Sequence, residues 1–480
     1  MQSSVIYDKK MYIGGELVDG VAVLDVVNPA TEDVVGKVAA AGLPDVEKAL
    51  AAADAAKTSW ARTSIAERQD WMRALRNEVI ANEEYLRTCI HDEMGKPWAG
   101  TQEDFDLLER SLHFYAEEIA RVRDEILPDR QGTHTHRLEY EPAGVAVAYL
   151  AWNFPLLNLA YKLGPAMAAG CPIIIRPSAA TPMSAYAVGE LCHKIGLPDG
   201  VVNILTTDGY GPSDALAAST IPSLITLIGS TATGRHLMRV ASTSIKKMSM
   251  ELGGNAPVLV YSDADLDLAA DIVTAVKFNN AGQICVTPNR VFVERAVLEK
   301  FTKMVVSRAE ATPVGFDRNK PIVTGPLIDG RAWKRVKGLI DQAVGAGADL
   351  LTGGDRPSQF NRGHYLAPTV LGNVTPEMDI YRNEIFGPVV SLIPFDDRDD
   401  LIDRANDGDD GGLASYIFTR DLALAEDVAS RLRYGEIQIN GVKYDIDLPH
   451  GGIGQSGIGH DCSHLALNDY LILKRISRAV

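Results

Sequence analysis

Short apolar runs alternate with helical stretches from Pro142 onward. The runs occupy Val145–Leu150, Pro172–Arg176, Val201–Leu205, Leu224–Ile228 and Lys246–Glu251. Apolar residues at helical spacing fill the intervals and predict helices over Leu156–Ala169, Met183–Ile195 and Thr233–Ala241. Continuous apolar strands separated by crossover-sized intervals are typical of a parallel sheet covered on both faces. The pattern predicts a doubly wound, Rossmann-like α/β unit.

A second alternation follows Gly253-Gly254. Its apolar runs are Pro257–Tyr261, Arg290–Glu294, Pro388–Phe395 and Leu413–Phe418, with helices near Leu266–Asn279 and Trp333–Gly345. Ahead of both units, further helices are predicted at Pro44–Trp60, Ile65–Ile80, Glu83–Met94 and Glu103–Arg121. The segments Leu138–Tyr140 and Tyr470–Arg475 alternate briefly outside either unit. The chain is therefore expected to hold two α/β units with separate cores.

Composition narrows the function classes. A chain of 480 residues is too long for one core, and 46 % hydrophobic with 23 % charged residues is ordinary globular usage. The net charge of −16 (47 basic and 63 acidic residues) argues against nucleic-acid binding. Five scattered cysteines and an N-terminus without signal-peptide features predict a reducing, cytoplasmic setting.

One uncharged stretch, Ala143–Tyr161, has the length of a membrane span. Pro155 and Asn158 would leave polar groups unsatisfied in lipid, so the stretch is interpreted as a buried strand that leads into a helix, with no membrane partner.

No metal site is predicted. His460, Cys462 and His464 alternate on a loop without a second ligand cluster. His134 and His136 are likewise interpreted as loop residues.

Four features carry candidate chemistry. The segment Gly229–Gly234 follows an apolar strand and opens a helix, which suits phosphate binding but also describes an ordinary tight turn. Cys285 follows a Gly282-Gln283 turn that would expose its thiol, whereas most cysteines are small core residues. Glu251 ends a strand beside two glycines, either as a general base or as a solvated rim residue. Asn153 is either a satisfied buried amide or a donor to an oxyanion.

The motifs together resemble the aldehyde dehydrogenase superfamily over nearly the whole chain. The tail around Tyr434-Gly435-Glu436 and from His450 through Asp461 is most similar to its lactaldehyde and glycolaldehyde branch. The matching segments, in family order, are Asn28-Pro29-Ala30-Thr31, Trp152-Asn153-Phe154-Pro155, Gly229–Gly234, Glu251-Leu252-Gly253-Gly254, Gly282-Gln283-Ile284-Cys285 with Arg290, Glu384-Ile385-Phe386-Gly387-Pro388 and Ser456-Gly457-Ile458-Gly459.

The resemblance implies a three-part subunit that forms homodimers or homotetramers. The expected parts are a dinucleotide-binding domain at 1–123 and 143–250, a catalytic domain at 251–445, and a small β oligomerisation element at 124–142 and 463–480.

The resemblance also implies a mechanism that oxidises an aldehyde to the acid. Cys285 would attack the aldehyde to give a thiohemiacetal, then a thioester, and Asn153 with the Cys285 backbone N–H would form the oxyanion hole. Glu251 would activate water for deacylation, and Lys162 would lie near that base.

The implied cofactor is NAD or NADP. The expected contacts are Trp152, Arg176, Ser178, Ala179, Gly229, Ser230, Gly234, Leu252, Glu384 and Phe386. At the adenosine ribose the family usually has Lys-Pro-Ser-Glu, whereas this chain has Arg176-Pro177-Ser178-Ala179. The lost carboxylate and the gained guanidinium admit a 2′-phosphate, so both cofactors stay open.

The implied substrate is a small polar aldehyde, either lactaldehyde- or glycolaldehyde-like or a semialdehyde. The expected pocket residues are Phe154, Leu157, Asn158, Tyr161, Ile284, Val286 and His450, the last of which replaces a usual aromatic. Two alternatives stay open: a CoA-acylating enzyme, against which Glu251 argues, and a non-catalytic protein that keeps the fold.

Overall fold

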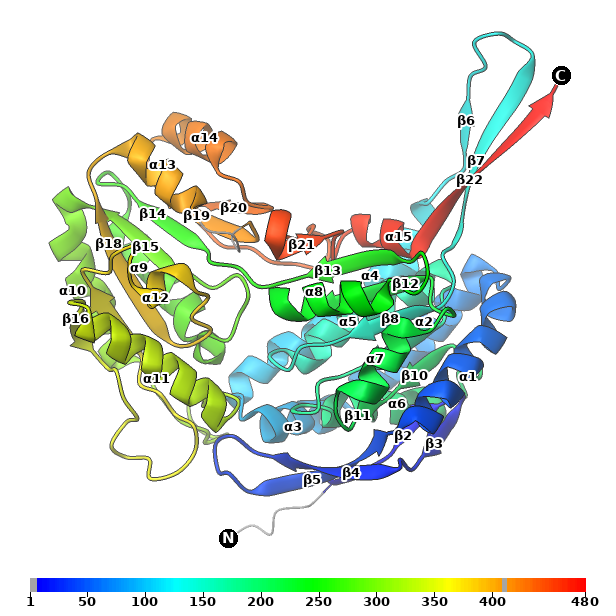
Figure 1. Cartoon of the computed structure of the whole chain (residues 1–480), viewed down its shortest axis with the longest axis horizontal. Coiled ribbons are helices and arrows are strands. Elements are labelled where there is room, and N and C mark those ends of the chain that lie inside the picture. The colour runs from blue at the N-terminus through cyan, green and yellow to red at the C-terminus, as the bar shows by residue number, and fades with distance from the viewer. Residues whose placement is uncertain (1–6, 408–411) are drawn as a thin grey trace.

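The larger of two large sheets carries the first α/β alternation (Figure 1). The computed structural model describes residues 7–407 and 412–480. Five strands of this sheet are parallel, in the order β13 (Lys247–Glu251), β12 (Leu224–Ile228), β8 (Ala146–Tyr149), β9 (Ile173–Arg176) and β10 (Val202–Ile204). Antiparallel strands β21 (Gly457–Ile458), β2 (Met11–Ile13) and β3 (Glu16–Val18) extend its two ends.

The chain winds across this sheet in two directions from β8. It runs through α5 (Pro155–Ala169), β9 and α6 (Met183–Lys194) to β10, and later through β12 and α8 (Thr231–Ala241) to β13 on the other side. Because such crossovers are right-handed, the two sets of helices cover opposite faces. The winding reverses between β8 and β12, and the carboxyl ends of the strands at such a point are where α/β sheets bind ligands.

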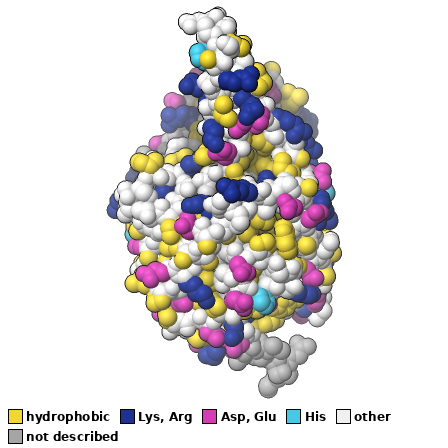
Figure 2. Space-filling view, turned by 90° about the vertical axis from the view of Figure 1, so that its right-hand side faces the viewer, with side chains coloured by type: hydrophobic (Ala, Val, Ile, Leu, Met, Phe, Trp, Pro, Cys, Tyr) yellow, Lys and Arg dark blue, Asp and Glu magenta, His cyan; other side chains and the backbone are white. Residues whose placement is uncertain are grey.

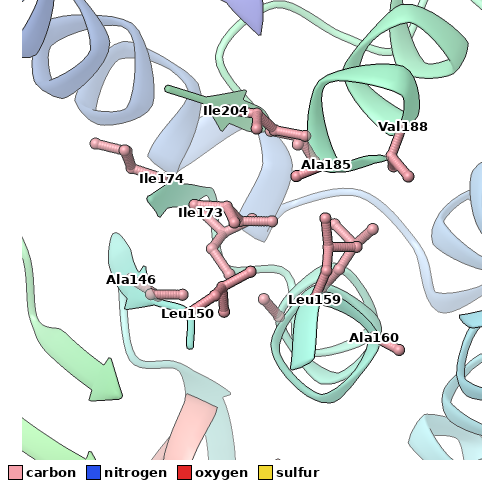
Figure 3. Close-up of a cluster of buried hydrophobic side chains, with 14 of the residues drawn as sticks. Ala146, Leu150, Leu159, Ala160, Ile173, Ile174, Ala185, Val188 and Ile204 are labelled. Carbon is pink, nitrogen blue, oxygen red and sulfur yellow. The ribbon is translucent and has the colours of Figure 1, made fainter. Parts of the chain in front are cut away.

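The apolar core between this sheet and its helices follows the predicted pattern (Figure 3). Ile173 and Ile174 are both fully buried although they point to opposite faces of β9, as consecutive strand residues must. Leu159 of α5 and Val188 of α6 pack on the same face as Ile173. Burial on both faces explains why these strands lack polar alternation.

The second sheet has seven strands and its own two core clusters. Its order is β16 (Asp349–Thr352), β17 (Thr369–Gly372), β18 (Val389–Phe395), β15 (Arg290–Glu294), β14 (Pro257–Val260), β19 (Ala414–Phe418) and β20 (Glu436–Ile439), all parallel except β16. The predicted α/β class with two alternating units is confirmed. The stretch that has the length of a membrane span forms β8 and α5, as expected.

Helices before and after the first unit lie close to their predicted bounds. Those upstream are α1 (Leu43–Ala61), α2 (Ile65–Ala81), α3 (Glu83–Met94) and α4 (Thr101–Glu118). Those of the second unit are α9 (Leu266–Phe278) and α11 (Gly330–Gly345). The helices that were not predicted are α7 (Tyr210–Ala218), α10 (Arg295–Ala311), α12 (Asp379–Arg382), α13 (Arg398–Asn406), α14 (Leu422–Arg431) and α15 (Leu465–Tyr470). No helix within the described ranges is long and apolar enough to cross a bilayer.

Two smaller sheets complete the molecule. The first joins β1 (Tyr7–Lys9), β4 (Ala22–Val27), β5 (Val34–Ala41) and β11 (Thr206–Thr207). The second, called the arm here, joins β6 (Glu125–Leu127), β7 (His134–Pro142) and β22 (Leu471–Ala479) and projects from the body (Figure 1). The space-filling view shows basic and apolar side chains along it (Figure 2).

The arm corrects one expectation. His134 and His136 lie in β7, opposite Ala479 and Ser477 of β22, and not in a loop. The partner strand lies more than 300 residues away in sequence, so the local pattern around these histidines carries no sign of the pairing.

Candidate active site

A cavity of about 810 Å³ lies where the two large sheets face each other, and its wall includes the carboxyl ends of β8, β12 and β13. Most of the predicted site residues line it together. They are Trp152, Asn153, Phe154, Leu157, Asn158, Tyr161, Arg176, Ser178, Gly229, Ser230, Glu251, Ile284, Cys285, Val286, Glu384, Phe386 and His450. Residues up to 300 positions apart are thus brought into one continuous space.

Four predicted residues do not line this cavity: Lys162, Ala179, Gly234 and Leu252. Gly234 lies within α8, where an added Cβ would meet Leu252 at 2.9 Å, so the two residues pack against each other. The Lys162 ammonium is fully buried and binds Asp461 at 2.5 Å. Asp461 in turn exchanges two backbone hydrogen bonds with His450, so Lys162 reaches the cavity only through this segment.

An unusual turn presents Cys285. Asn280, Ala281 and Gly282 all have left-handed backbone angles, with φ of 48°, 53° and 70°. A Cβ on Gly282 would lie 2.2 Å from the Gly387 carbonyl oxygen, so only glycine fits there. The buried Gln283 side chain fixes the turn by donating to Asn280 O and accepting from the Ile328 N–H. Cys285 itself remains partly exposed, unlike the other four cysteines, which are buried.

The Asn153 side chain is held beside this turn. Its Nδ2 donates to Gln283 O at 3.0 Å, and its Oδ1 accepts from Asn158 Nδ2 at 3.2 Å. The following helix, α5, has no cap of its own, and the buried Asp104 carboxylate accepts the N–H groups of its first turn. The amide is therefore oriented from both sides.

Glu251, Cys285 and His450 form the centre of the cavity. One atom of each, a carboxylate oxygen, the sulfur and a ring nitrogen, lie within 4.8 Å of one another. His450 Nε2 is 3.4 Å from Glu251 Oε1, an ion-pair distance without hydrogen-bond alignment, and that oxygen has no hydrogen-bond partner among the described residues. The Glu251 carboxylate thus lies beside the thiol and the imidazole and lines the cavity.

The surroundings shift the pKa values of Cys285 and His450. Burial and the Glu251 charge raise the pKa of the Cys285 thiol to about 12, although His450 acts in the opposite direction and lowers this pKa. Burial alone would lower the pKa of His450, but the Glu436 charge and hydrogen bonds raise it well above its ordinary value. These interactions favour the protonated form of the imidazole beside the thiol.

The other end of the cavity contains the predicted dinucleotide contacts. Ser230 caps α8, its Oγ accepting from the Thr233 N–H at 3.2 Å. The Arg176 guanidinium reaches Thr207 Oγ1 at 3.4 Å, but its buried Nε has no partner in the described part of the chain. Between this end and Cys285, the Trp152 and Phe386 rings meet edge to face at 5.5 Å.

Glu384 lies between these two ends. Its carboxylate lies so close to Gly253 that a Cβ added there would be 2.5 Å from Glu384 Oε2. The carboxylate also accepts the Gly254 N–H at 3.5 Å. Burial raises its pKa to about 7. Arg335 on α11 donates to the backbone oxygens of residues 384 and 385 and so holds this segment.

Sequence reasoning missed several residues of the site. Glu436 binds His450 Nδ1 at 2.6 Å, and Tyr444, Glu103 and Arg335 line the cavity. A smaller cavity of about 270 Å³ shares Tyr161, Tyr444 and His450 with the main one. Only Glu436 carried a signal, as part of the Tyr434-Gly435-Glu436 segment that resembles the lactaldehyde branch.

Comparison with known proteins gives the family. The model of the aldehyde dehydrogenase family matches residues 18–476. The NADP-dependent succinate-semialdehyde dehydrogenase of Escherichia coli is 34 % identical over 99 % of this chain and 98 % of its own. A succinate-semialdehyde dehydrogenase structure from Burkholderia pseudomallei superposes with a TM-score of 0.96 at 36 % identity, with all of both chains covered.

A third similar protein is the lactaldehyde dehydrogenase of Escherichia coli. Its structure superposes with a TM-score of 0.95 at 32 % identity, covering 99 % of this chain and 100 % of that one. The family match spans nearly the whole chain, and it agrees with the motif order and with the α/β architecture. The protein belongs to the aldehyde dehydrogenase family and is an NAD(P)-dependent aldehyde dehydrogenase.

Proposed function

We propose that Cys285 is the nucleophile of this aldehyde dehydrogenase. The observation that carries the proposal is the left-handed turn that presents its sulfur to the cavity, within 4.8 Å of Glu251 and His450. Sulfur attack on the aldehyde carbon gives a thiohemiacetal oxyanion. The Asn153 amide, oriented by Gln283 and Asn158, and the Cys285 backbone N–H stabilise that charge. A free thiol also needs a reducing compartment, which supports a cytoplasmic location.

Glu251 is the general base for deacylation in this proposal. Its Oε1 is buried without a hydrogen-bond partner and lies next to the sulfur that would carry the acyl group. A water bound to this carboxylate from the cavity can give up its proton as it attacks the thioester, which releases the acid. A base in this position favours hydrolysis over transfer of the acyl group to CoA.

The residues of the cavity fit a nicotinamide dinucleotide. The unpartnered Arg176 Nε at one end and the Glu384 carboxylate over Gly253 suit phosphate and ribose groups, respectively. When bound, the dinucleotide supplies the hydride acceptor. The chain's own part is to orient it: Ser230 and the start of α8 at the pyrophosphate, Glu384 at a ribose, and Trp152 with Phe386 toward Cys285.

Arg176 favours NADP over NAD. Its side chain is half-buried and lines the cavity, its Nε has no partner among the described residues, and position 179 is alanine and supplies no carboxylate. A 2′-phosphate would supply the missing acceptor in a charge-assisted hydrogen bond. The NADP-dependent relative from Escherichia coli is consistent with this preference.

The aldehyde end of the cavity favours an uncharged polar aldehyde over a semialdehyde, which carries a carboxylate. Among the residues that line the main cavity, the two arginines, Arg176 and Arg335, lie toward the cofactor contacts. The His450 imidazolium already faces two carboxylates, Glu251 and Glu436. The carboxylate of a bound semialdehyde would therefore be buried here without a cation as partner. Burying an unpaired charge costs on the order of several kcal/mol of binding free energy.

A panel of aldehydes tests this function. We expect kcat/KM with glycolaldehyde or lactaldehyde to exceed that with succinate semialdehyde by about ten-fold or more, since an unpaired carboxylate costs at least about 1.4 kcal/mol. We also expect NADP to give higher kcat/KM than NAD. The measurement is aldehyde-dependent reduced-nicotinamide absorbance, with aldehyde-free reactions as controls. A preference for succinate semialdehyde would contradict the substrate class, and absence of turnover with every aldehyde would contradict the function.

The three-part division 1–123 with 143–250, 251–445, and 124–142 with 463–480 is retained as a proposal. It is supported by the projecting arm and by the core clusters: one holds residues up to Leu252 and again from Ile446 onward, and the other two hold residues between Ala256 and Tyr434. The arm exposes apolar side chains, among them Ile126 (74 % exposed) and Leu473 (55 %). Exposed apolar strands of this kind favour an interface, and we propose that a second copy of this chain covers the arm in a homodimer or homotetramer.

The assembly is tested by light scattering after gel filtration. We expect a mass of two or four 51.9 kDa subunits, and a shift toward the monomer in the double variant Ile126→Asp, Leu473→Asp, because buried carboxylates would oppose association. Leu422→Asp is the matched control, since Leu422 is also exposed (64 %) but begins α14 in the second unit. A monomeric wild-type protein would rule the proposal out.

A further inference from the structure

His450 contacts the polar residues at the centre of the cavity as well as lining the substrate pocket. Its ring is buried, with Nδ1 bonded to Glu436 Oε1 at 2.6 Å and Nε2 directed toward Glu251 and the Cys285 sulfur. A thiol, an imidazole and a carboxylate in this order form the arrangement that activates cysteine nucleophiles elsewhere, where the carboxylate orients and charges the ring.

We propose that His450 is a further catalytic residue, whose imidazolium, held by Glu436, stabilises the Cys285 thiolate in the free enzyme. The inference rests on the proposed role of Cys285 as the nucleophile. In the step concerned, the Cys285 S–H bond breaks and its proton passes to solvent, while the imidazolium keeps its own proton. No electrons are transferred, and the new negative charge on sulfur faces the existing positive charge on the ring.

The surroundings explain why the thiol needs this partner. Burial and the Glu251 charge both raise the pKa of Cys285, and His450 supplies the interactions that lower it. Glu436 is the positioning residue, because its charge and hydrogen bond keep the pKa of His450 high in spite of burial. The Tyr161 and Tyr444 rings pack beside the imidazole, with ring centroids 5.9 and 6.2 Å from its own, and limit its movement.

Several titratable groups surround His450, apart from Asp461 behind it, whose carboxylate pairs with Lys162 at 2.5 Å. These groups are Glu251, Glu436, Cys285, Cys462, Tyr161, Tyr416 and Tyr444. Burial raises the pKa of Cys462 to about 12, and the tyrosines are also shifted upward by burial, so these four are neutral near neutral pH. The cation thus stands among two carboxylates and the reacting thiol.

The test is the pH dependence of Cys285 alkylation by iodoacetamide in the cofactor-free protein, which reports the thiolate without aldehyde turnover. Loss of an opposite charge at this range moves a pKa by about 1–3 units. We therefore expect the midpoint in His450→Phe and His450→Gln to rise by that amount, with alkylation at pH 7.5 slowed about ten-fold per unit. Glu436→Gln should shift the midpoint in the same direction but less, since the ring remains.

Two controls separate the possible outcomes. His464→Gln removes an exposed histidine of the same segment and should leave the profile unchanged. Peptide mapping identifies the alkylated residue. Unchanged midpoints in both His450 variants, with melting temperatures near the wild-type value, would overturn the role of His450 and leave the nucleophile assignment standing. Alkylation that persists at the wild-type rate in Cys285→Ala would instead overturn the proposed function.

Discussion

Replacing Cys285 with alanine is expected to lower aldehyde-dependent reduction of NADP by at least about 10³-fold, because the variant lacks the sulfur that forms the covalent acyl intermediate. Cofactor binding should be retained, since the dinucleotide contacts proposed at Arg176, Ser230 and Glu384 do not involve the sulfur. Steady-state absorbance measures the first quantity, and quenching of tryptophan fluorescence by NADP measures the second.

The matched control for this variant is Cys192→Ala, which removes a thiol from the core of α6, outside the cavity. Its turnover should stay within a few-fold of the wild-type value. Substantial turnover by Cys285→Ala would show that another residue performs the attack.

Replacing Glu251 with glutamine is expected to slow deacylation by about 10²–10⁴-fold, because the amide cannot accept the proton of the attacking water. Sulfur attack and oxidation precede this step and should be affected less. Stopped-flow absorbance should therefore show a rapid burst of reduced cofactor, close to one equivalent per active site, followed by slow turnover.

The control for Glu251→Gln is Glu299→Gln, which neutralises an exposed carboxylate on α10 and should behave as the wild type. A slow, burst-free trace from Glu251→Gln would mean that the carboxylate acts before the thioester forms, and the assignment of the base would be wrong.

Much of the fold follows from local pattern. Strands β8, β9, β12 and β15 lie within one residue of their predicted bounds because each is a short, mostly apolar run buried at nearly every position. The helix α10 (Arg295–Ala311) was not predicted, since only Phe301, Val305 and Ala309 of its 17 residues are buried and six are charged, so its apolar stripe is narrow. The full length of β7 was not predicted either, because the strand is formed by pairing with β22, which lies at the other end of the chain.

The site was predictable where a motif carried it and not where tertiary structure assembled it. The residues around Cys285, Glu251 and Asn153 lie in segments with a recognisable order, and they do meet in one cavity. Glu436 joins them only because β20 packs beside β19, which brings its carboxylate to His450. No spacing in the sequence relates residue 436 to residues 251 and 285, so the carboxylate–imidazole–thiol arrangement required the fold.

The central claim is that Cys285 holds the acyl group until water activated by Glu251 releases it. The most direct measurement is mass spectrometry of Glu251→Gln after brief mixing with NADP and glycolaldehyde and quenching in acid. The account predicts one acyl adduct per subunit, mapped to the peptide that contains Cys285 and absent when NADP is omitted. An unmodified Cys285 peptide, in a sample that has produced a stoichiometric burst of NADPH, would contradict it.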